Sequence, residues 1–233
     1  MGRVLRPLGV TRAALVTGAA GGIGRAVVER LEADGWDVHG VDVDDGDLTT
    51  REGNRAVVEA ALARFGRLDA VVANAGFQHV APVREFPEEQ WQRLVAVLLT
   101  SPFLLAKYAW DALSASGDGR FLAVASVHGL VASPFKAGYV AAKHGVLGLV
   151  KVLALEGVEA GITASAICPA YVRTGIVERQ LEQRSLDDLL APQAVRRLLE
   201  PAEVAAAAAW LLGPEGRAVN GQPLVMDLGW TAR

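Results

Sequence analysis

Short runs of consecutive apolar residues alternate with longer segments of helical periodicity along this chain, and this alternation restricts its fold more than any other feature. A strand that is apolar at every position is buried on both faces, as in a parallel sheet covered by helices on both sides. The sequence therefore predicts an α/β fold with a doubly wound parallel sheet. The expected strands are 13–18, 37–43, 69–76, 121–126, 162–168 and 223–229, and the expected helices are 23–35, 52–65, 87–113, 139–156 and 201–212.

Length and composition predict one domain over residues 1–233, because 52% hydrophobic and 21% charged residues suffice for a large buried core. A net charge of −3 without a Lys/Arg cluster argues against nucleic-acid binding. The single cysteine, Cys168, cannot form an intrachain disulfide, which suits the reducing cytoplasm. No apolar stretch near the N-terminus has the form of an export signal, and no uninterrupted apolar run reaches the length of a membrane span. We therefore expect a cytoplasmic protein without membrane contact.

The region between the second expected strand and the third is shorter than a regular doubly wound sheet requires. Such a sheet would place a helix and a further strand before the helix at 52–65, and only the stub "GDLT" (46–49) is present. Thr49 and Glu52 have the spacing of a capping box for that helix. The sequence thus predicts a sheet that lacks one helix–strand pair at this edge.

A glycine loop, "TGAAGGIG" (17–24), follows the first expected strand and opens the first helix. Gly18, Gly22 and Gly24 allow the backbone to approach a pyrophosphate, which the N–H groups of the helix start can bind. The alternative is a glycine turn used only for packing. The order strand, glycine loop and helix favours a Rossmann-type nucleotide site.

Asp42 follows the second strand, 18 residues after Gly24. A carboxylate at this place accepts hydrogen bonds from the adenosine ribose and repels a 2′-phosphate, which favours NAD over NADP. The alternative is an exposed acid in the acidic turn "DVDDGD".

Three polar residues in an apolar part of the chain predict acid/base chemistry. Tyr139 and Lys143 are four residues apart on an expected helix and therefore share one face. Ser126 ends an expected strand, at the sheet edge where α/β proteins bind ligands. A nearby lysine ammonium is expected to lower the pKa of the tyrosine, so that its hydroxyl exchanges protons near neutral pH. An ordinary amphipathic helix would also produce the Tyr–Lys spacing.

The motifs "TGAAGGIG", "NAG" (74–76), "ASVHG" (125–129) and "YVAAK" (139–143) resemble the short-chain dehydrogenase/reductase family over almost the whole chain. Longer stretches, including "NAGFQHVAPVREFPEE", "SVHGLVASPFKAGYVAAKHG" and "CPAYVRTGIVERQ", are similar to D-3-hydroxybutyrate dehydrogenases. The resemblance implies a cofactor half over about 1–125 and a catalytic and substrate half over about 126–233.

The resemblance also implies residue roles. Ser126 would hydrogen-bond the substrate oxygen, Tyr139 would exchange its proton, and Lys143 would bind the nicotinamide ribose. The cofactor-binding residues would be Gly18, Gly22, Ile23, Gly24, Asp42, Asp47, Leu48, Asn74, Ala75, Gly76, Tyr139, Lys143, Val172 and Thr174. The substrate carboxylate would be bound by Gln78, His128, Lys136 and Gln180, and Trp230 would close the pocket. No metal is implied. Taken singly, each of these substrate residues is also compatible with an ordinary surface, loop or packing role.

Three positions depart from the family pattern. Leu98 stands where the family has an asparagine that holds a proton-relaying water, Ala170 replaces a usual glycine, and Ala73 replaces a common asparagine. Leucine has no hydrogen-bonding group for such a water. We therefore expect intact chemistry at Ser126 and Tyr139 with a weakened proton exit.

The leading functional hypothesis is NAD-dependent, reversible oxidation of (R)-3-hydroxybutyrate to acetoacetate, a reaction of ketone body metabolism. One alternative is another short-chain reductase that acts on 3-oxoacyl thioesters or a different hydroxy acid. A second alternative is a non-catalytic protein that senses NAD. The resemblance further implies a homotetramer formed through the helices at 87–113 and 139–156 and through the C-terminal segment.

Overall fold

The computed structural model describes residues 11–182 and 184–232. Its centre is a six-stranded parallel sheet with the order β2-β1-β3-β4-β5-β6. The N-terminal segment 1–10, part of the region in which we expect no export signal, lies outside the described residues. The strands are β1 (Ala13–Thr17), β2 (Asp37–Val41), β3 (Ala70–Ala73), β4 (Gly119–Val124), β5 (Ile162–Pro169) and β6 (Pro223–Met226).

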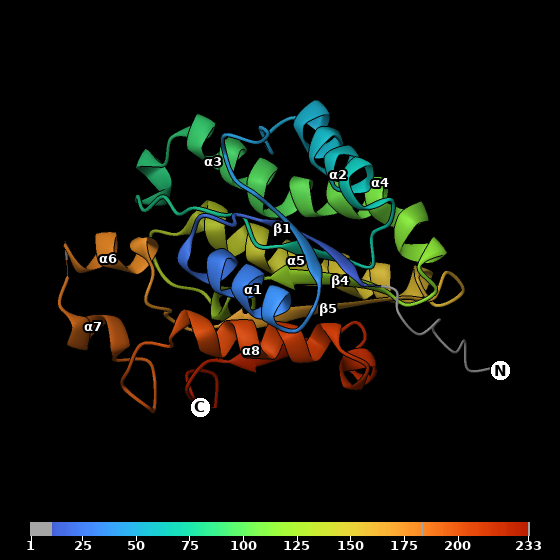
Figure 1. Cartoon of the computed structure of the whole chain (residues 1–233). Helices are drawn as coiled ribbons and strands as arrows, with labels where there is room; N and C mark the ends of the chain where they lie inside the picture. The colour runs from blue at the N-terminus through green and yellow to red at the C-terminus, as the bar shows by residue number, and fades with distance from the viewer. Residues whose placement is uncertain (1–10, 183, 233) are drawn as a thin grey trace.

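Helices cover both faces of this sheet, as the alternating pattern predicts (Figure 1). One face carries α1 (Gly22–Ala33) and α8 (Pro201–Leu212), and the other carries α2 (Arg51–Phe65), α4 (Ser101–Ala115) and α5 (Ala137–Glu156). The short helices α6 (Gly175–Leu181) and α7 (Leu186–Leu190) project from one end of the layers, in orange in Figure 1. Three 3-10 turns lie at Val83–Glu85, Val127–Gly129 and Glu215–Ala218.

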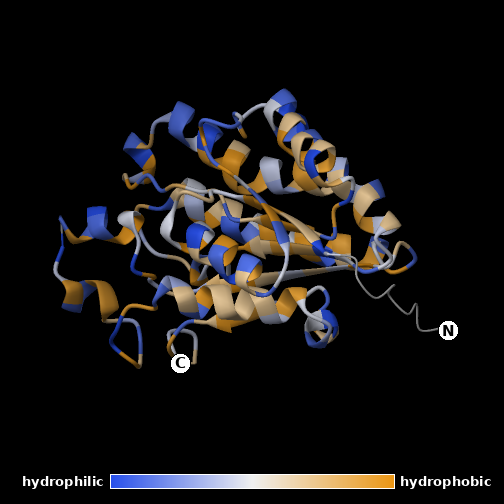
Figure 2. Ribbon diagram, viewed as in Figure 1, coloured by the Kyte–Doolittle hydropathy of each residue, from blue (hydrophilic) through white to orange (hydrophobic). Residues whose placement is uncertain are grey.

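Two apolar cores separate along the strands because successive side chains point to opposite faces. In β1, Leu15 packs with Leu105 and Val146 on the α4–α5 side, whereas Val16 packs with Val27 on the α1–α8 side. Figure 2 shows the hydrophobic residues gathered on the strands and on the helix faces turned toward them. The prediction of a doubly wound parallel sheet is confirmed.

The expected helix at 87–113 is not uniform. It consists of α3 (Glu88–Val95), a π-helical stretch over Ala96–Thr100, and then α4. A π-helical stretch inserts one residue into the helical repeat and is frequent at functional sites. Leu98, the departure from the family pattern, lies within it.

The sheet ends at β2, which pairs only with β1 among the described residues. The chain then runs directly into α2, so the predicted loss of a helix–strand pair is confirmed. The expected capping box is wrong, however: α2 begins at Arg51, and Thr50 caps it by accepting a 3.0 Å hydrogen bond from the Gly53 N–H. The N-cap is the residue directly before the first helical residue, and Thr49 instead donates its hydroxyl to Asp47.

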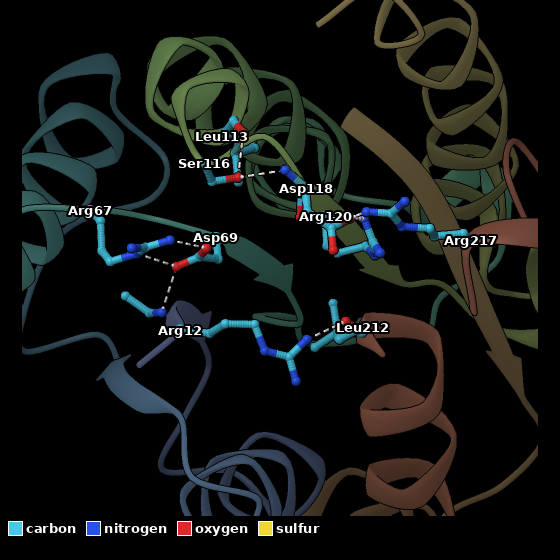
Figure 3. A network of polar contacts seen from close by, with 10 residues as sticks. Arg12, Arg67, Asp69, Leu113, Ser116, Asp118, Arg120, Leu212 and Arg217 are labelled. Atoms are coloured by element: carbon cyan, nitrogen blue, oxygen red, sulfur yellow. Dashed lines mark hydrogen bonds and ion pairs between the residues drawn. The ribbon is translucent and has the colours of Figure 1, made fainter. Parts of the chain in front are cut away.

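A polar network holds the amino ends of the strands together (Figure 3). Asp69 accepts bonds of 2.8 and 2.7 Å from Arg67 and also accepts the first backbone N–H of β1. Asp118 forms ion pairs with the buried Arg120 of β4 and with Arg217. The strands have their carboxyl ends at the opposite edge of the sheet, where other loops leave the strands.

Two helical stretches, 88–115 and Ala137–Glu156, are long and apolar enough to cross a membrane by length and composition alone. In the fold α4 packs against β3 and β4, and α5 packs against β5. Burial against the sheet therefore accounts for their apolar character.

Candidate active site

A cavity of about 620 Å³ opens at the carboxyl ends of the strands. The loops after five successive strands of the sheet line it, each contributing at least one residue: Gly18, Asp42, Asn74, Ser126 and Ala170. This edge is where open α/β sheets bind ligands. Every residue that the sequence assigns to the cofactor lines this cavity, so the structure brings that whole set together.

The glycine loop has the geometry that a phosphate requires. Gly18 adopts a left-handed φ of +69°, and a Cβ on Gly24 would lie 2.0 Å from the Gly18 carbonyl oxygen. Helix α1 begins at Gly22 after an N-cap glycine, and no side chain of the described residues caps its first N–H groups. These donors and the helix dipole are therefore available to a bound anion.

Asn74 braces this loop from the end of β3. Its side-chain amide donates to the carbonyl oxygens of Thr17 and Gly18, at 2.9 and 3.2 Å. The Thr17 hydroxyl in turn accepts the N–H groups of Asn74 and Ala75 at 3.1 Å each. Asn74 thus holds the glycine turn in place in addition to lining the cavity.

Two carboxylates lie at the β2 end of the cavity. Asp42 accepts the N–H groups of Ala20 and Val43, each at 2.8 Å, which fixes the carboxylate between the glycine loop and its own turn. Hydrogen bonds from Thr49 lower the pKa of Asp47, so this carboxyl is charged at neutral pH. The missing helix–strand pair brings Asp47 to this end of the cavity shortly after β2.

Ser126, Tyr139 and Lys143 converge on the other end of the cavity. The Lys143 ammonium lies 5.6 Å from the centre of the Tyr139 ring and donates a 2.6 Å hydrogen bond to the carbonyl oxygen of Val124. Burial lowers the pKa of Lys143 to about 8. The i,i+4 spacing on α5 therefore places the tyrosine and the lysine at one site, beside the end of β4.

The expected lowering of the tyrosine pKa is wrong for the protein without ligand. Desolvation raises the pKa of Tyr139 to about 12, and a hydrogen bond with Ser126 offsets only part of this effect. The Lys143 ammonium is directed toward the backbone of Val124, so its charge is shared with a carbonyl group. Tyr139 is therefore protonated at neutral pH and ready to donate its proton to a carbonyl oxygen.

His128 lies between two serines. Its Nδ1 atom is 3.4 Å from Oγ of Ser126, and its Nε2 atom is 2.8 Å from Oγ of Ser133. The ring packs edge-on against the rings of Tyr139 and Trp230, with centroids 6.0 and 5.4 Å apart. Burial, followed by the positive charge of Lys136, lowers the pKa of His128 to about 3, so the imidazole is neutral.

Lys136 and Trp230 are the two predicted substrate residues that do not line the cavity. They stand behind Tyr171, which does: its ring centre is 5.4 Å from the Lys136 ammonium and 5.4 Å from the Trp230 ring centre. Lys136 is 4% exposed, and its ammonium has no hydrogen-bond partner among the described residues. Burial and the charge of Arg184 lower its pKa to about 8.

Gln78 and Gln180 meet across the cavity. Nε2 of Gln180, on α6, donates a 2.9 Å hydrogen bond to Oε1 of Gln78, after β3. Two residues that the resemblance assigns to the substrate therefore lie together, although 102 positions separate them in the chain.

The sequence did not single out several residues of this site. Tyr171 contributes a cavity wall, and Arg184 adds positive charge near Lys136. Tyr171 directly follows the "CPA" end of β5, so its place at the strand edge was a usable signal. Arg184 and Ser133 lie in loops, where spacing gives no indication of what their side chains contact.

Leu98 also lines the cavity, and it is 2% exposed. It packs with Leu94, Ala142 and the ring of Tyr139, and a Cβ on Gly76 would lie 2.8 Å from its Cδ2 atom. The position that the resemblance assigns to a water-holding asparagine is thus occupied by an apolar contact.

Comparison with known proteins identifies the relatives of this chain. A family profile described as enoyl-(acyl carrier protein) reductase matches residues 40–231. D-beta-hydroxybutyrate dehydrogenase of Rhizobium meliloti (strain 1021) is 35% identical, over 96% of this chain and 100% of that protein. The 3-oxoacyl-(acyl-carrier-protein) reductase FabG of Vibrio cholerae serotype O1 is 32% identical, over 94% of this chain and 96% of that protein.

The same fold occurs in a solved structure. The ligand-free aldohexose dehydrogenase of Thermoplasma acidophilum has a TM-score of 0.88 to this chain at 26% identity. The match covers 96% of this chain and 95% of the other.

Proposed function

Because this chain belongs to the short-chain dehydrogenase/reductase family, whose members are oxidoreductases, we propose that it interconverts (R)-3-hydroxybutyrate and acetoacetate with NAD. The observation that carries the choice of substrate is Lys136, whose buried ammonium lies behind the cavity wall and has no hydrogen-bond partner in the described part of the chain. A buried charge of this kind is costly unless it meets an opposite charge. A substrate carboxylate supplies one.

The residues present fit a nicotinamide dinucleotide. The glycine loop and the start of α1 offer N–H donors to the pyrophosphate, and a Cβ at Gly24 would block the approach of the loop. Asp42 supports NAD rather than NADP because its carboxylate, held by Ala20 and Val43, accepts ribose hydroxyls and repels a phosphate. The nicotinamide ring, when bound, accepts or returns the hydride.

The residues of this chain perform the proton half of the reaction. In the direction of reduction, Ser126 donates a hydrogen bond to the carbonyl oxygen, and Tyr139 transfers its hydroxyl proton to that oxygen. In the direction of oxidation, the phenolate form of Tyr139 takes the proton of the alcohol and returns to the neutral hydroxyl. Lys143, whose pKa lies at about 8, supplies a positive charge that stabilises the phenolate when its ammonium turns from Val124 toward Tyr139.

Substrate recognition follows from the charge distribution beyond Ser126. The ammonium of Lys136 and the nearby Arg184 make this side of the site positive, and Gln78 and Gln180, joined by a hydrogen bond, line the same cavity. A 3-hydroxy acid carries its carboxylate a short distance from the reacting alcohol. An acid is therefore bound with its alcohol oriented toward Tyr139.

A reductase of 3-oxoacyl thioesters is the alternative, supported by the 32% identity to the Vibrio cholerae enzyme. The neutral thioester makes no use of the buried Lys136 ammonium, which is why we favour the acid. A protein that only senses NAD is disfavoured by the convergence of Ser126, Tyr139 and Lys143 at one end of the cavity.

Initial rates with a panel of substrates test the proposal. We expect NADH formation, followed at 340 nm, with (R)-3-hydroxybutyrate, and much slower formation with the mirror-image acid or with NADP. Faster turnover of a 3-oxoacyl thioester would establish the alternative. NAD(H) binding in a calorimeter without turnover of any hydroxy acid would establish the sensor.

Substitution of Leu98 by asparagine is expected to raise kcat, by up to roughly 10²-fold, because it restores a polar group that holds a proton-relaying water beside the site. The thermal midpoint is expected to fall, since an amide replaces an apolar side chain in a buried cluster. Leu98→Met, which keeps the volume without a polar group, is the matched control. Equal or lower turnover in the asparagine variant would contradict a role for the relay.

We further propose a cytoplasmic homotetramer. Apolar side chains on the outer faces of α4 and α5 remain exposed in the single chain, among them Phe103, Val152 and Leu155. Exposed apolar surface of this kind is typical of association surfaces. The two long apolar helices thus bury one side on the sheet and offer the other to a further copy of the chain.

A further inference from the structure

We propose that Ser133 is a positioning residue that fixes the tautomer of His128, and that His128 thereby keeps the hydroxyl proton of Ser126 directed at the substrate oxygen. This inference rests on the proposed use of Ser126 and Tyr139 in proton transfer. It assigns a function to Ser133, which no motif indicates, and it changes the role of His128.

The geometry is a chain of hydrogen-bonding groups that runs from the reacting atoms outward. Oγ of Ser126 accepts the backbone N–H of His128 at 3.1 Å, and the Nδ1 atom of the same residue lies 3.4 Å away. On the far side of the ring, Nε2 lies 2.8 Å from Oγ of Ser133. Ser126 and His128 are buried, whereas Ser133, in the loop before α5, is half-buried.

A neutral imidazole has one N–H donor and one bare acceptor nitrogen, so each tautomer gives this chain a different direction. If Nε2 carries the proton, it donates to Ser133, and the bare Nδ1 is an acceptor that competes for the hydroxyl proton of Ser126. A proton donated to Nδ1 is turned away from the substrate. If Nδ1 carries the proton, it donates to Ser126, and Nε2 accepts the hydroxyl of Ser133.

The proposed proton transfer needs the second arrangement, in which Nδ1 of His128 carries the proton. A serine hydroxyl has two acceptor sites and one proton. The backbone N–H and Nδ1–H of His128 then fill both acceptor sites of Ser126. Its single proton is given to the oxygen of Tyr139 before the substrate binds and to the substrate oxygen afterwards. A hydrogen bond between Ser126 and Tyr139 already lowers the pKa of the tyrosine in part.

This arrangement leaves His128 without a free N–H group for the substrate carboxylate. The resemblance to D-3-hydroxybutyrate dehydrogenases implies that His128 contacts the carboxylate, whereas here both ring nitrogens lie next to serine hydroxyls. Lys136, Gln78 and Gln180 therefore bind the carboxylate, and His128 acts on the reaction through Ser126.

The tautomer can be read directly from the ¹⁵N chemical shifts of protein labelled with ¹⁵N-histidine, with His128 assigned by its absence in His128→Asn. We expect a protonated Nδ1 and a bare Nε2 in the native protein without ligand. In Ser133→Ala, which has no hydroxyl to donate, we expect the Nε2–H form to appear, and Ser133→Thr should restore the native form.

Kinetics of the same variants provide the second measurement. We expect Ser133→Ala to lower kcat about tenfold with little change in KM, since one hydrogen bond that orients Ser126 is lost. Ser133→Thr is expected to recover the rate, and Ser116→Ala, which removes a hydroxyl that bonds to the carbonyl of Leu113, is the matched control.

Two outcomes would overturn the proposal. One is a protonated Nε2 in the native protein. The other is a Ser133→Ala variant whose KM for the acid rises while kcat is unchanged, which would make His128 a carboxylate ligand. The tautomer is measured without substrate, so it stays informative if the enzyme proves to act on another alcohol, and the kinetic comparison is then made with that alcohol.

Discussion

Tyr139→Phe is expected to lower kcat by about 10²–10⁴-fold, because it removes the one hydroxyl that exchanges a proton with the substrate oxygen. The phenyl ring preserves the edge-on contact with His128 and the packing beside Leu98, so the fold should be unaffected. Cofactor affinity should change little, since the glycine loop and Asp42 are untouched.

The measurement is kcat for NAD reduction together with the NADH dissociation constant from calorimetry. Tyr108→Phe is the matched control, because Tyr108 lies on α4 under the guanidinium of Arg55 and does not line the cavity. Native turnover in the Tyr139→Phe variant would remove this tyrosine from the mechanism. A parallel loss of NADH binding would instead indicate that the substitution disturbs the site as a whole.

Lys136→Met is expected to raise KM for the hydroxy acid by about 10²-fold, the cost of removing one partner from a buried charge pair. Methionine keeps most of the length and apolar stem of lysine, so the surroundings of Tyr171 remain filled. The rate with a neutral ester of the same acid should not change. If the physiological substrate is a neutral thioester, its kcat/KM should also be unaffected, and this result would favour the alternative function.

The pH dependence of binding provides an independent test of Lys136. Its pKa of about 8 means that the ammonium loses its charge as the pH rises through this value. The affinity for butyrate, a carboxylate that cannot react, should therefore fall above pH 8 in the native enzyme and stay constant in Lys136→Met. Binding is the correct measurement because Lys143 titrates in the same range and would alter turnover.

The same pKa predicts an effect on stability. A lysine whose folded-state pKa lies below its ordinary value of 10.5 binds fewer protons in the folded protein, so stability rises with pH between about 8 and 10.5. Lys136→Met should accordingly have the higher thermal midpoint at pH 7, and the difference should shrink at higher pH. Lys107→Met, at an exposed position on α4, is the control.

Local sequence patterns predict the glycine loop and the helix α2 correctly, but they do not predict the residue that caps α2. The order of strand, glycine turn and helix at 13–33 depends on neighbouring residues, and it is confirmed. The helix at 52–65 is also confirmed, but its cap is Thr50 and not Thr49, because two adjacent threonines differ only in which one directly precedes the helix. The π-helical stretch at Ala96–Thr100 has no signal in the apolar periodicity.

The sequence by itself determined the doubly wound sheet, the missing helix–strand pair after β2, and the meeting of Ser126, Tyr139 and Lys143 at the carboxyl edge. These features follow from spacing along the chain and from the rule that parallel strands end at one edge. Only the tertiary structure decided that Lys143 turns to Val124 and that His128 lies between Ser126 and Ser133. It also decided that Lys136 is buried beside Tyr171, with no hydrogen-bond partner for its ammonium among the described residues. Desolvation and hydrogen-bond partners set those properties, and both depend on which distant residues the fold brings together.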